Sequence, residues 1–205
     1  MRGIFTASGV LLVGLLMGCT PAGDTDDSAI IAPGPTDVFP ASSACQGGIV
    51  EQAFEHGRMF WVGASAQEKC VVEHSFAPGT GEIWVVLLDE SGLTGDWLIF
   101  PDGWQAGRDA ESDPALVPSD GLMQPVRGFG RVWRLNLTEV ERAELGWALS
   151  PEAGFVSEYR YDPGGLINPD GDYIPRPGQH RLVGLDGTLY FFDELSLRVA
   201  IVPGS

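Results

Sequence analysis

The sequence predicts a mainly β protein: a small antiparallel β domain, or two related β units that share a core, with one short helix near residues 138–145. Three observations lead to this prediction. Short apolar and aromatic runs recur along the chain and are separated by turn-forming residues. Asp186-Gly187 between two apolar runs gives the clearest hairpin signal. Two distant stretches also resemble each other, as in a duplicated unit.

Six stretches fit strands because apolar, aromatic and β-branched residues fill them. Residues 89–92 form a turn signal between two of these stretches. Asp186-Gly187 lies between two further apolar runs, and this pair favours a tight primed hairpin turn. The expected strands span residues 58–62, 82–88, 97–100, 181–185, 188–192 and 195–202.

One helix is predicted near residues 138–145. Thr138 and Glu141 have the spacing of a capping box, in which each side chain bonds the other residue's backbone N–H. Gly146 follows as a C-terminal cap. The apolar side chains expected on one face of the helix are Leu137, Val140 and Leu145.

Residues 101–125 are rich in Gly, Pro, Asp and Ser and are predicted to form a long loop. Long loops inside compact domains are often functional. Trp97 precedes this loop and Trp104 lies near its start. We expect both to be exposed and to contribute to ligand binding, because flat aromatic faces stack on sugar rings. A place in the core of a small β domain is the alternative. The three tryptophans expected in the core are Trp61, Trp84 and Trp133.

An internal similarity links residues 48–57 with residues 154–164, with one insertion. Each stretch is followed by an aromatic strand near an acidic turn, at residues 84–90 and 190–194. The pattern indicates two copies of one β unit. Chance similarity between two β-rich stretches is the alternative.

The first residues have the features of an export signal. A single basic residue, Arg2, precedes a short apolar run over residues 4–17, which is too short to cross the hydrocarbon core of a membrane comfortably. The run ends in Leu16-Met17-Gly18-Cys19, which resembles the lipobox of bacterial lipoproteins. The resemblance implies that residues 1–18 are a signal peptide and that Cys19 carries a lipid. An ordinary secretory signal with a chance cysteine, or an uncleaved segment, is the alternative.

The lipobox also implies a location and a domain layout. The mature protein would be lipid-anchored at the cell membrane or the outer membrane and would face away from the cytoplasm. Residues 19–44 contain several Pro and Asp and no basic residue, so they are expected to form a flexible acidic tether. Residues 45–205 would form the β-rich extracytoplasmic domain.

The cysteines fit an exported protein. With Cys19 lipidated, Cys45 and Cys70 remain, and an oxidising environment favours a disulfide between them. Two free buried thiols are the alternative. A structural zinc site is not expected, because no further Cys or His stands at ligand spacing.

The net charge of the chain restricts the classes of molecule that it is expected to bind. The formal net charge is −16, and nucleic-acid binding needs clustered Lys and Arg. No nucleic-acid partner is therefore expected. Docking of the domain itself on anionic lipid headgroups is disfavoured for the same reason.

A second resemblance covers roughly residues 50–161. Residues 54–61 fit the pattern F-E-x-G-x-M-x-W, residues 124–134 fit Q-P-x-x-G-F-G-x-V-W-R, and residues 145–148 read L-G-W-A. This order is similar to an uncharacterised repeat of secreted and surface proteins of environmental bacteria. The resemblance implies a surface location and a repeated architecture, and it implies no activity.

The remaining candidate sites are few. Asn168, Asp170 and Asp172 place oxygen side chains at alternate positions, which is a pattern that calcium favours. An ordinary turn is the alternative reading. No catalytic residue is predicted, because no nucleophile motif occurs and His56, His74 and His180 are scattered and expected at the surface.

These observations predict a membrane-anchored surface lipoprotein. Its domain would be a non-catalytic binding module for envelope or extracellular material, either a polysaccharide or a protein. Two alternatives remain open: a hydrolase of surface glycans that uses carboxylates, and a structural component of an envelope assembly. A binding module predicts exposed aromatic side chains on one face, whereas a hydrolase predicts two acids in a deep cleft.

Overall fold

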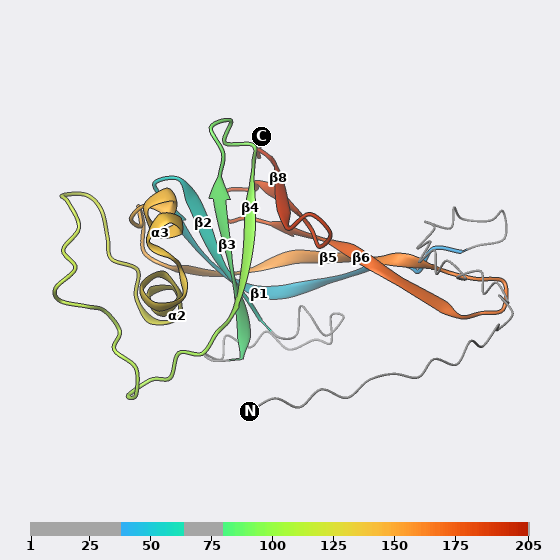
Figure 1. Ribbon diagram of the computed structural model, residues 1–205, viewed down its shortest axis with the longest axis horizontal. Coiled ribbons are helices and arrows are strands. Elements are labelled where there is room, and N and C mark those ends of the chain that lie inside the picture. Colours follow the sequence, from blue (N-terminus) through green and yellow to red (C-terminus); the bar gives the residue numbers. More distant parts are fainter. Residues whose placement is uncertain (1–37, 64–79, 205) are drawn as a thin grey trace, which may run out of the picture. The chain divides into compact units, whose positions relative to one another are not determined.

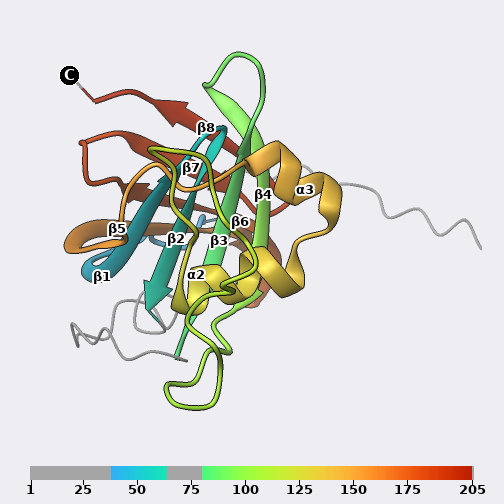
Figure 2. The same ribbon diagram turned by 90° about the vertical axis from the view of Figure 1, so that its left-hand side faces the viewer.

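The computed structural model describes residues 38–63 and 80–204. Within these residues, eight antiparallel strands form a closed barrel in the order β1-β2-β3-β4-β8-β7-β6-β5 (Figures 1 and 2). The predicted mainly β, antiparallel fold is thus confirmed. The strands are β1 (Ser43–Phe54), β2 (Gly57–Gly63), β3 (Gly81–Leu88), β4 (Thr94–Pro101), β5 (Ala153–Ile167), β6 (Tyr173–Val183), β7 (Leu189–Asp193) and β8 (Arg198–Val202).

The barrel consists of two four-stranded meanders, β1–β4 and β5–β8, which join first strand to first strand and last strand to last strand. The two similar stretches of sequence lie in β1 and β5, and the aromatic runs that follow them lie in β3 and β7. The similar segments therefore occupy equivalent places in the two meanders. The topology fits the hypothesis of two related units, and their common origin stays a prediction.

Aromatic and aliphatic side chains fill the inside of the barrel, as expected for a barrel of this strand number. The rings of Phe60 and Tyr190 pack edge-on with centroids 4.9 Å apart, as do those of Trp84 and Trp97. Such pairs add to the stability that burial alone provides. The buried residues of this inner core are Ile49, Phe60, Val62, Trp84, Val86, Trp97, Tyr159, Leu182, Tyr190, Phe192 and Val199.

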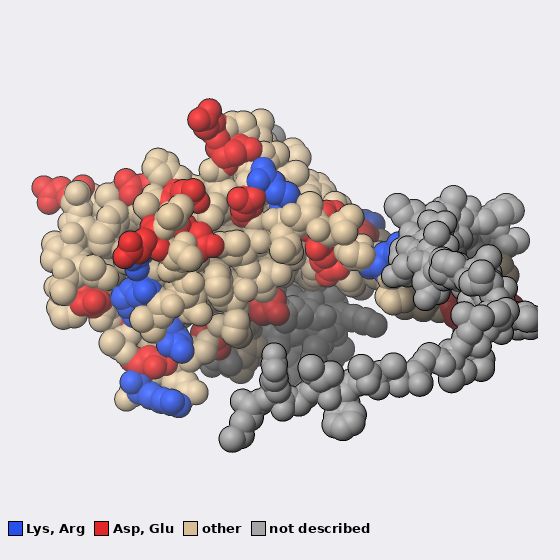
Figure 3. All heavy atoms as spheres, viewed as in Figure 1, with Lys and Arg blue, Asp and Glu red and all other residues tan. Residues whose placement is uncertain are grey.

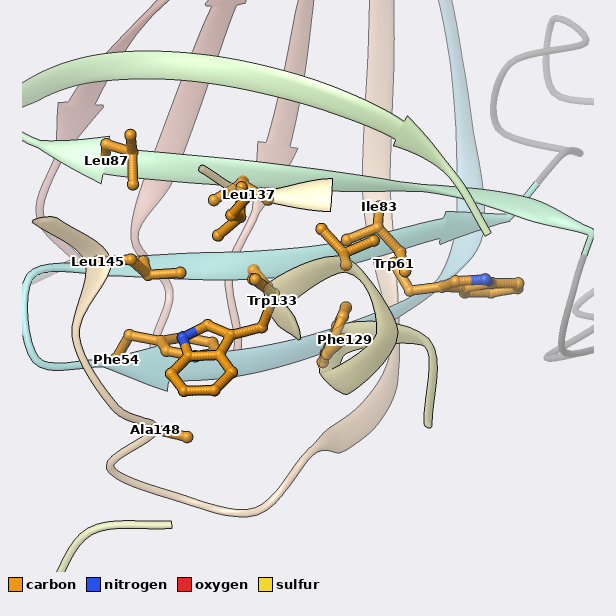
Figure 4. Packing of buried hydrophobic residues seen from close by; sticks show 12 residues of the cluster. Phe54, Trp61, Ile83, Leu87, Phe129, Trp133, Leu137, Leu145 and Ala148 are labelled. Atoms are coloured by element: carbon orange, nitrogen blue, oxygen red, sulfur yellow. The ribbon is translucent and has the colours of Figure 1, made fainter. Parts of the chain in front are cut away.

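A second core lies outside the barrel, because β2 and β3 are buried on both faces. It is covered by α2 (Arg127–Arg131), the π-helical turn η1 (Val132–Asn136) and α3 (Glu139–Leu145) (Figures 2 and 4). The buried residues of this outer core are Phe54, Met59, Trp61, Ile83, Val85, Leu87, Phe129, Val132, Trp133, Leu137, Leu145 and Ala148. The predicted core positions of Trp61, Trp84 and Trp133 are confirmed.

The helical segment 127–136 was not expected from the sequence. Its glycines are required by close packing: a Cβ on Gly130 would lie 2.4 Å from the backbone oxygen of Pro125, and one on Gly128 would lie 2.9 Å from Oδ1 of Asp102. Glycine usually disfavours helices. Here the outer core stabilises the helical turns, since Phe129 and Trp133 are both buried in it.

The predicted helix forms as α3. Thr138 and Glu141 make both bonds of the capping box, and Gly146 ends the helix with φ of 78°. Leu137 and Leu145 are buried, but Val140 is 65 % exposed, so its expected place on the buried face was wrong. Leu145 is five positions after Val140, so their side chains point about 140° apart at 3.6 residues per turn.

The β6–β7 hairpin is confirmed, but its turn is longer than predicted. It spans residues 184–188, where Gly184 donates a hydrogen bond to Thr188 and Gly187 alone takes positive φ. Asp186 does not take positive φ. Its Oδ1 accepts from the Thr188 N–H and its Oδ2 pairs with Arg58. The type I′ turn that Asp-Gly favours would require positive φ at both central residues.

Several predictions fall on residues outside the described ranges. These are the signal peptide over residues 1–18, lipidated Cys19 and residues 20–37 of the predicted tether. Cys70 also lies outside, so its pairing with Cys45 stays a prediction. The tether was predicted to reach residue 44, but β1 begins at Ser43 and Val38 exchanges backbone hydrogen bonds with Ile167. Within residues 38–63 and 80–204, no helix combines the length and the apolar character that a membrane crossing needs.

The outer core predicts a contrast between two residues of α3. Leu145→Ala should lower the free energy of unfolding by about 2–5 kcal/mol, because it removes a fully buried side chain. Val140→Ala on the same helix should change it by less than about 0.5 kcal/mol. Urea unfolding of both variants measures this contrast. Equal losses would show that α3 does not pack as described.

Candidate functional site

A pocket of about 320 Å³ opens where the β4–β5 connection meets the outer faces of β2 and β3. We call it the Trp104 pocket. Figure 4 shows three of its aromatic and aliphatic walls, Trp61, Ile83 and Phe129, at one end of the outer core. Its lining residues are Val50, Trp61, Ile83, Asp102, Trp104, Arg127, Gly128, Phe129, Glu152 and Gly154.

Asp102 fixes two walls of the Trp104 pocket. This buried residue follows β4 directly. Its Oδ2 accepts a hydrogen bond from the Trp61 indole at 3.0 Å, and its Oδ1 accepts one from the Trp104 backbone N–H at 3.1 Å. Hydrogen bonds to an ionised carboxylate are among the stronger ones in proteins. Asp102 thereby holds the Trp61 side chain and the Trp104 backbone in fixed positions.

Trp104 lies in the pocket wall and is only 6 % exposed. The expectation that it is exposed was wrong, because Asp102 binds both the Trp61 indole and the Trp104 backbone and so holds the first residues of the connection against the barrel. Its indole Nε1 is buried and has no hydrogen-bond partner among the described residues. An unpaired buried donor costs about 1–3 kcal/mol. This unpaired donor belongs to a side chain of the pocket wall.

Glu152 supplies an unpaired acceptor. Its Oε1 is buried without a hydrogen-bond partner in the described chain, and its Oε2 lies 3.9 Å from Nη1 of Arg127. Burial raises the pKa of Glu152, the negative charges of Asp102 and Glu111 act in the same direction, and Arg127 opposes them. The carboxyl group is thus poorly solvated and open to a hydrogen-bonding ligand.

Arg127 lines the Trp104 pocket and has a strained backbone conformation. Its φ is 48°, in the left-handed region that costs a non-glycine residue about 1–3 kcal/mol. Its backbone N–H donates to the carbonyl of Glu111, and its Nε lies 3.8 Å from Oε1 of the same residue. The guanidinium is thereby placed near both Glu111 and Glu152, where it balances part of their charge.

The chemistry of the Trp104 pocket favours binding over hydrolysis. A carboxylate-dependent hydrolase needs two acids that act on the substrate. Here both oxygens of Asp102 are occupied by Trp61 and Trp104, so Glu152 remains as the acid with an unpaired oxygen. Flat rings, one unpaired donor and one unpaired acceptor suit a molecule with an apolar face and hydroxyl groups.

Trp97 lies elsewhere. It is 2 % exposed and belongs to the inner core, so its expected exposure was also wrong. It lines a different pocket at one end of the barrel, together with His180 and Glu194. The two tryptophans proposed for ligand binding therefore do not form one exposed aromatic face.

Sequence reasoning missed Asp102, Arg127 and Glu152 as site residues. They come from the two ends of the β4–β5 connection and from the start of α2, and the barrel brings them together. One local signal was present, because the turn-favouring dipeptide Asp102-Gly103 immediately precedes Trp104. His180 was expected at the surface, but it is largely buried between aromatic rings.

The proposed calcium residues lie in the turn between β5 and β6. The Asn168 side chain accepts a hydrogen bond from the backbone N–H of Asp172, and Gly171 takes positive φ. These bonds account for the Asn and Gly as turn residues. In the described part of the chain, no group of three or more His, Cys, Asp or Glu side chains could hold a metal ion.

Comparisons with protein-family models, with curated proteins and with solved structures give no match to this chain. The proposed function therefore rests on the geometry of this chain's own residues.

The raised pKa of Glu152 predicts that the free energy of unfolding depends on pH. Its folded pKa is raised above the ordinary 4.5, so between these two values the folded state holds a proton that the unfolded state has lost. Stability from this group is full below pH 4.5 and is lost as pH rises through the folded pKa. Glu152→Gln should therefore become more stable relative to the wild type as pH rises.

Urea unfolding between about pH 4 and pH 8 measures this difference. Glu90→Gln, at an exposed turn, is the control and should not show the same trend. A difference between Glu152→Gln and wild type that stays constant over this range would contradict the buried, poorly solvated position of Glu152.

Proposed function

We propose that this protein is a membrane-anchored, non-catalytic module that binds an uncharged glycan of the cell envelope or its surroundings in the Trp104 pocket. The observation that carries this proposal is the combination of aromatic walls with an unpaired indole N–H on Trp104 and an unpaired carboxyl oxygen on Glu152. Sugar rings offer apolar faces to the walls, and their hydroxyls both donate and accept hydrogen bonds.

The size and charge of the pocket support a short glycan segment. Its volume of about 320 Å³ is at the small end of the range of about 300–1,000 Å³ for ligand pockets. Arg127 offsets one of the two lining carboxylates, so the walls carry no excess of positive charge to attract an anion. The acidic side chains visible in Figure 3 also favour uncharged or cationic ligands over anionic ones.

A protein partner, a glycan hydrolase and a part in an envelope assembly are the other candidate functions. The concave pocket favours a small ligand over a flat protein interface. The occupied oxygens of Asp102 argue against an acid pair. These alternatives are outcomes of the test below.

The proposal includes a lipid anchor on Cys19. Leu16-Met17-Gly18-Cys19 would direct cleavage before Cys19 and lipidation of its sulfur. Residues 19–37 would hold the domain away from the membrane, because Val38 already bonds to Ile167 and β1 begins at Ser43. Two or three acyl chains give firm anchoring, whereas one is marginal. Cys45 and Cys70 would form a disulfide in this oxidising environment.

Glycan binding predicts that Trp104→Ala weakens the affinity by about tenfold or more, because it removes an aromatic wall and a hydrogen-bond donor. The mature chain is applied to a glycan array, and hits are titrated by calorimetry. Val117→Ala, at an exposed position of the same connection, is the matched control and should bind as the wild type does.

Several outcomes would reject the proposal. Absence of saturable glycan binding by the folded wild type would do so, as would equal binding by Trp104→Ala. Release of cleaved sugars would instead favour the hydrolase. Capture of one envelope protein that does not depend on Trp104 would favour the assembly role.

The anchor predicts that Cys19→Ala moves the protein from the membrane fraction to the soluble fraction of the producing cell, because the thiol that accepts the lipid is gone. Fractionation with detergent extraction measures this, and mass spectrometry of the wild type should find acyl chains on the peptide that begins at Cys19. A Cys19→Ala protein that remains in the membrane fraction would contradict the anchor.

A further inference from the structure

A second pocket, of about 410 Å³, lies at one end of the barrel. The residues that line this pocket come from the start of β3, the second half of β4, the middle of β5 and β6, and the segment between β7 and β8 (Figure 1). We call it the barrel-end pocket. Its lining residues are Glu82, Trp84, Trp97, Ile99, Tyr159, Tyr161, His180, Glu194 and Leu197.

Aromatic rings form most of the barrel-end pocket. The centroid of Tyr161 lies 4.8 Å from that of His180, and the centroids of Trp84 and Trp97 lie 5.2 and 5.4 Å from it. The ring of Tyr159 lies 5.9 Å away. The faces of aromatic rings carry negative potential and attract cations.

The imidazole at the centre of this cluster is held by two neighbours. Nδ1 of His180 lies 2.6 Å from the Tyr159 hydroxyl, and its Nε2 lies 2.9 Å from Oε1 of Glu194. A neutral ring with its proton on Nε2 satisfies both contacts, since it accepts from the tyrosine and donates to the carboxylate. Burial also lowers the pKa of His180 and favours this neutral form.

The charge on the lining residues is therefore negative. Glu82 accepts a hydrogen bond from the Trp84 indole, and Glu194 accepts one from the backbone N–H of Gly178. No Lys or Arg lines the barrel-end pocket. Two carboxylates among aromatic rings favour a ligand with a positive charge and an apolar surface.

One polar group remains unpaired. The Nε1 of Trp97 is buried and has no hydrogen-bond partner among the described residues. A ligand with a hydroxyl or carbonyl oxygen beside its cationic group could accept this hydrogen bond. The unpaired Trp97 indole N–H indicates a polar ligand, and this evidence does not depend on the two carboxylates.

We propose that the barrel-end pocket binds a small organic cation with a quaternary ammonium group and a neighbouring oxygen atom. The aromatic rings contact the methyl groups of the cation, Glu82 and Glu194 supply the opposite charge, and the Trp97 indole donates to the oxygen. A quaternary ammonium has no N–H of its own, so it does not compete with the hydrogen bonds that Trp84 and His180 already make to the carboxylates.

The test compares choline with its uncharged carbon isostere, 3,3-dimethylbutan-1-ol, by calorimetry on the mature chain. Both molecules have the same shape and the same hydroxyl. Choline should bind saturably and at least about tenfold more tightly than the isostere, because only choline gains the charge interactions. Phosphocholine should bind more weakly than choline, because its phosphate faces two carboxylates.

Variants place the binding in the barrel-end pocket. Glu82→Gln keeps an acceptor for Trp84 but removes one charge, and it should weaken choline binding by about tenfold. Glu139→Gln, at an exposed position of α3, also removes one negative charge, but outside the barrel-end pocket. It should leave choline binding unchanged. Trp104→Ala should also bind choline normally, which separates this proposal from the glycan site.

Three results would overturn the proposal. They are equal affinity for choline and the isostere, unchanged choline binding by Glu82→Gln, and no saturable choline binding by the wild type. Near-UV circular dichroism of each variant, which reports on the packed tryptophans, verifies that the barrel is intact before any titration is interpreted.

Discussion

Closure of the barrel is the constraint on which the rest of the structure depends. The chain completes β1–β4 and must then place β5 beside β1, on the opposite side of that meander from β4. The connection over residues 102–152 therefore passes across the outer faces of β2 and β3. Because these faces are apolar, the connection covers them with helices, and the outer core forms where the crossing occurs.

The same crossing builds the Trp104 pocket. Asp102 stands where the connection leaves β4, and Glu152 stands where it returns to β5. A single carboxylate, Asp102, then holds the Trp61 side chain and the Trp104 backbone. Buried polar groups are normally paired. Within the described residues, the indoles of Trp97 and Trp104 are exceptions, and both line pockets, which is why we place ligands there.

The sequence was sufficient where local patterns decide the structure. Apolar runs located most of the strands, and the Thr138–Glu141 capping box located α3. The helical segment 127–136 was missed because its glycines oppose a helix locally, while tertiary packing stabilises it. The exposure of Trp97 and Trp104 was wrong because burial of a side chain next to a loop depends on how the loop folds back.

The Trp104 pocket could not be predicted for a related reason. Asp102 and Glu152 are fifty positions apart, and only the barrel topology brings them together. The residue types gave no distinct signal, since carboxylates are abundant in a chain with 28 Asp and Glu. The unpaired atoms of Trp104 and Glu152 are properties of the folded packing, and a residue list does not contain them.

The most direct test of the account follows the indole N–H signals of the six tryptophans by ¹⁵N NMR during titration with a glycan that the protein binds. If the glycan binds in the Trp104 pocket, the Trp104 and Trp61 signals shift together and saturate, because both residues line that pocket. The Trp133 signal should stay in place, since this indole donates to the backbone of Gly146 in the outer core. Shifts that spare Trp104 would contradict the account.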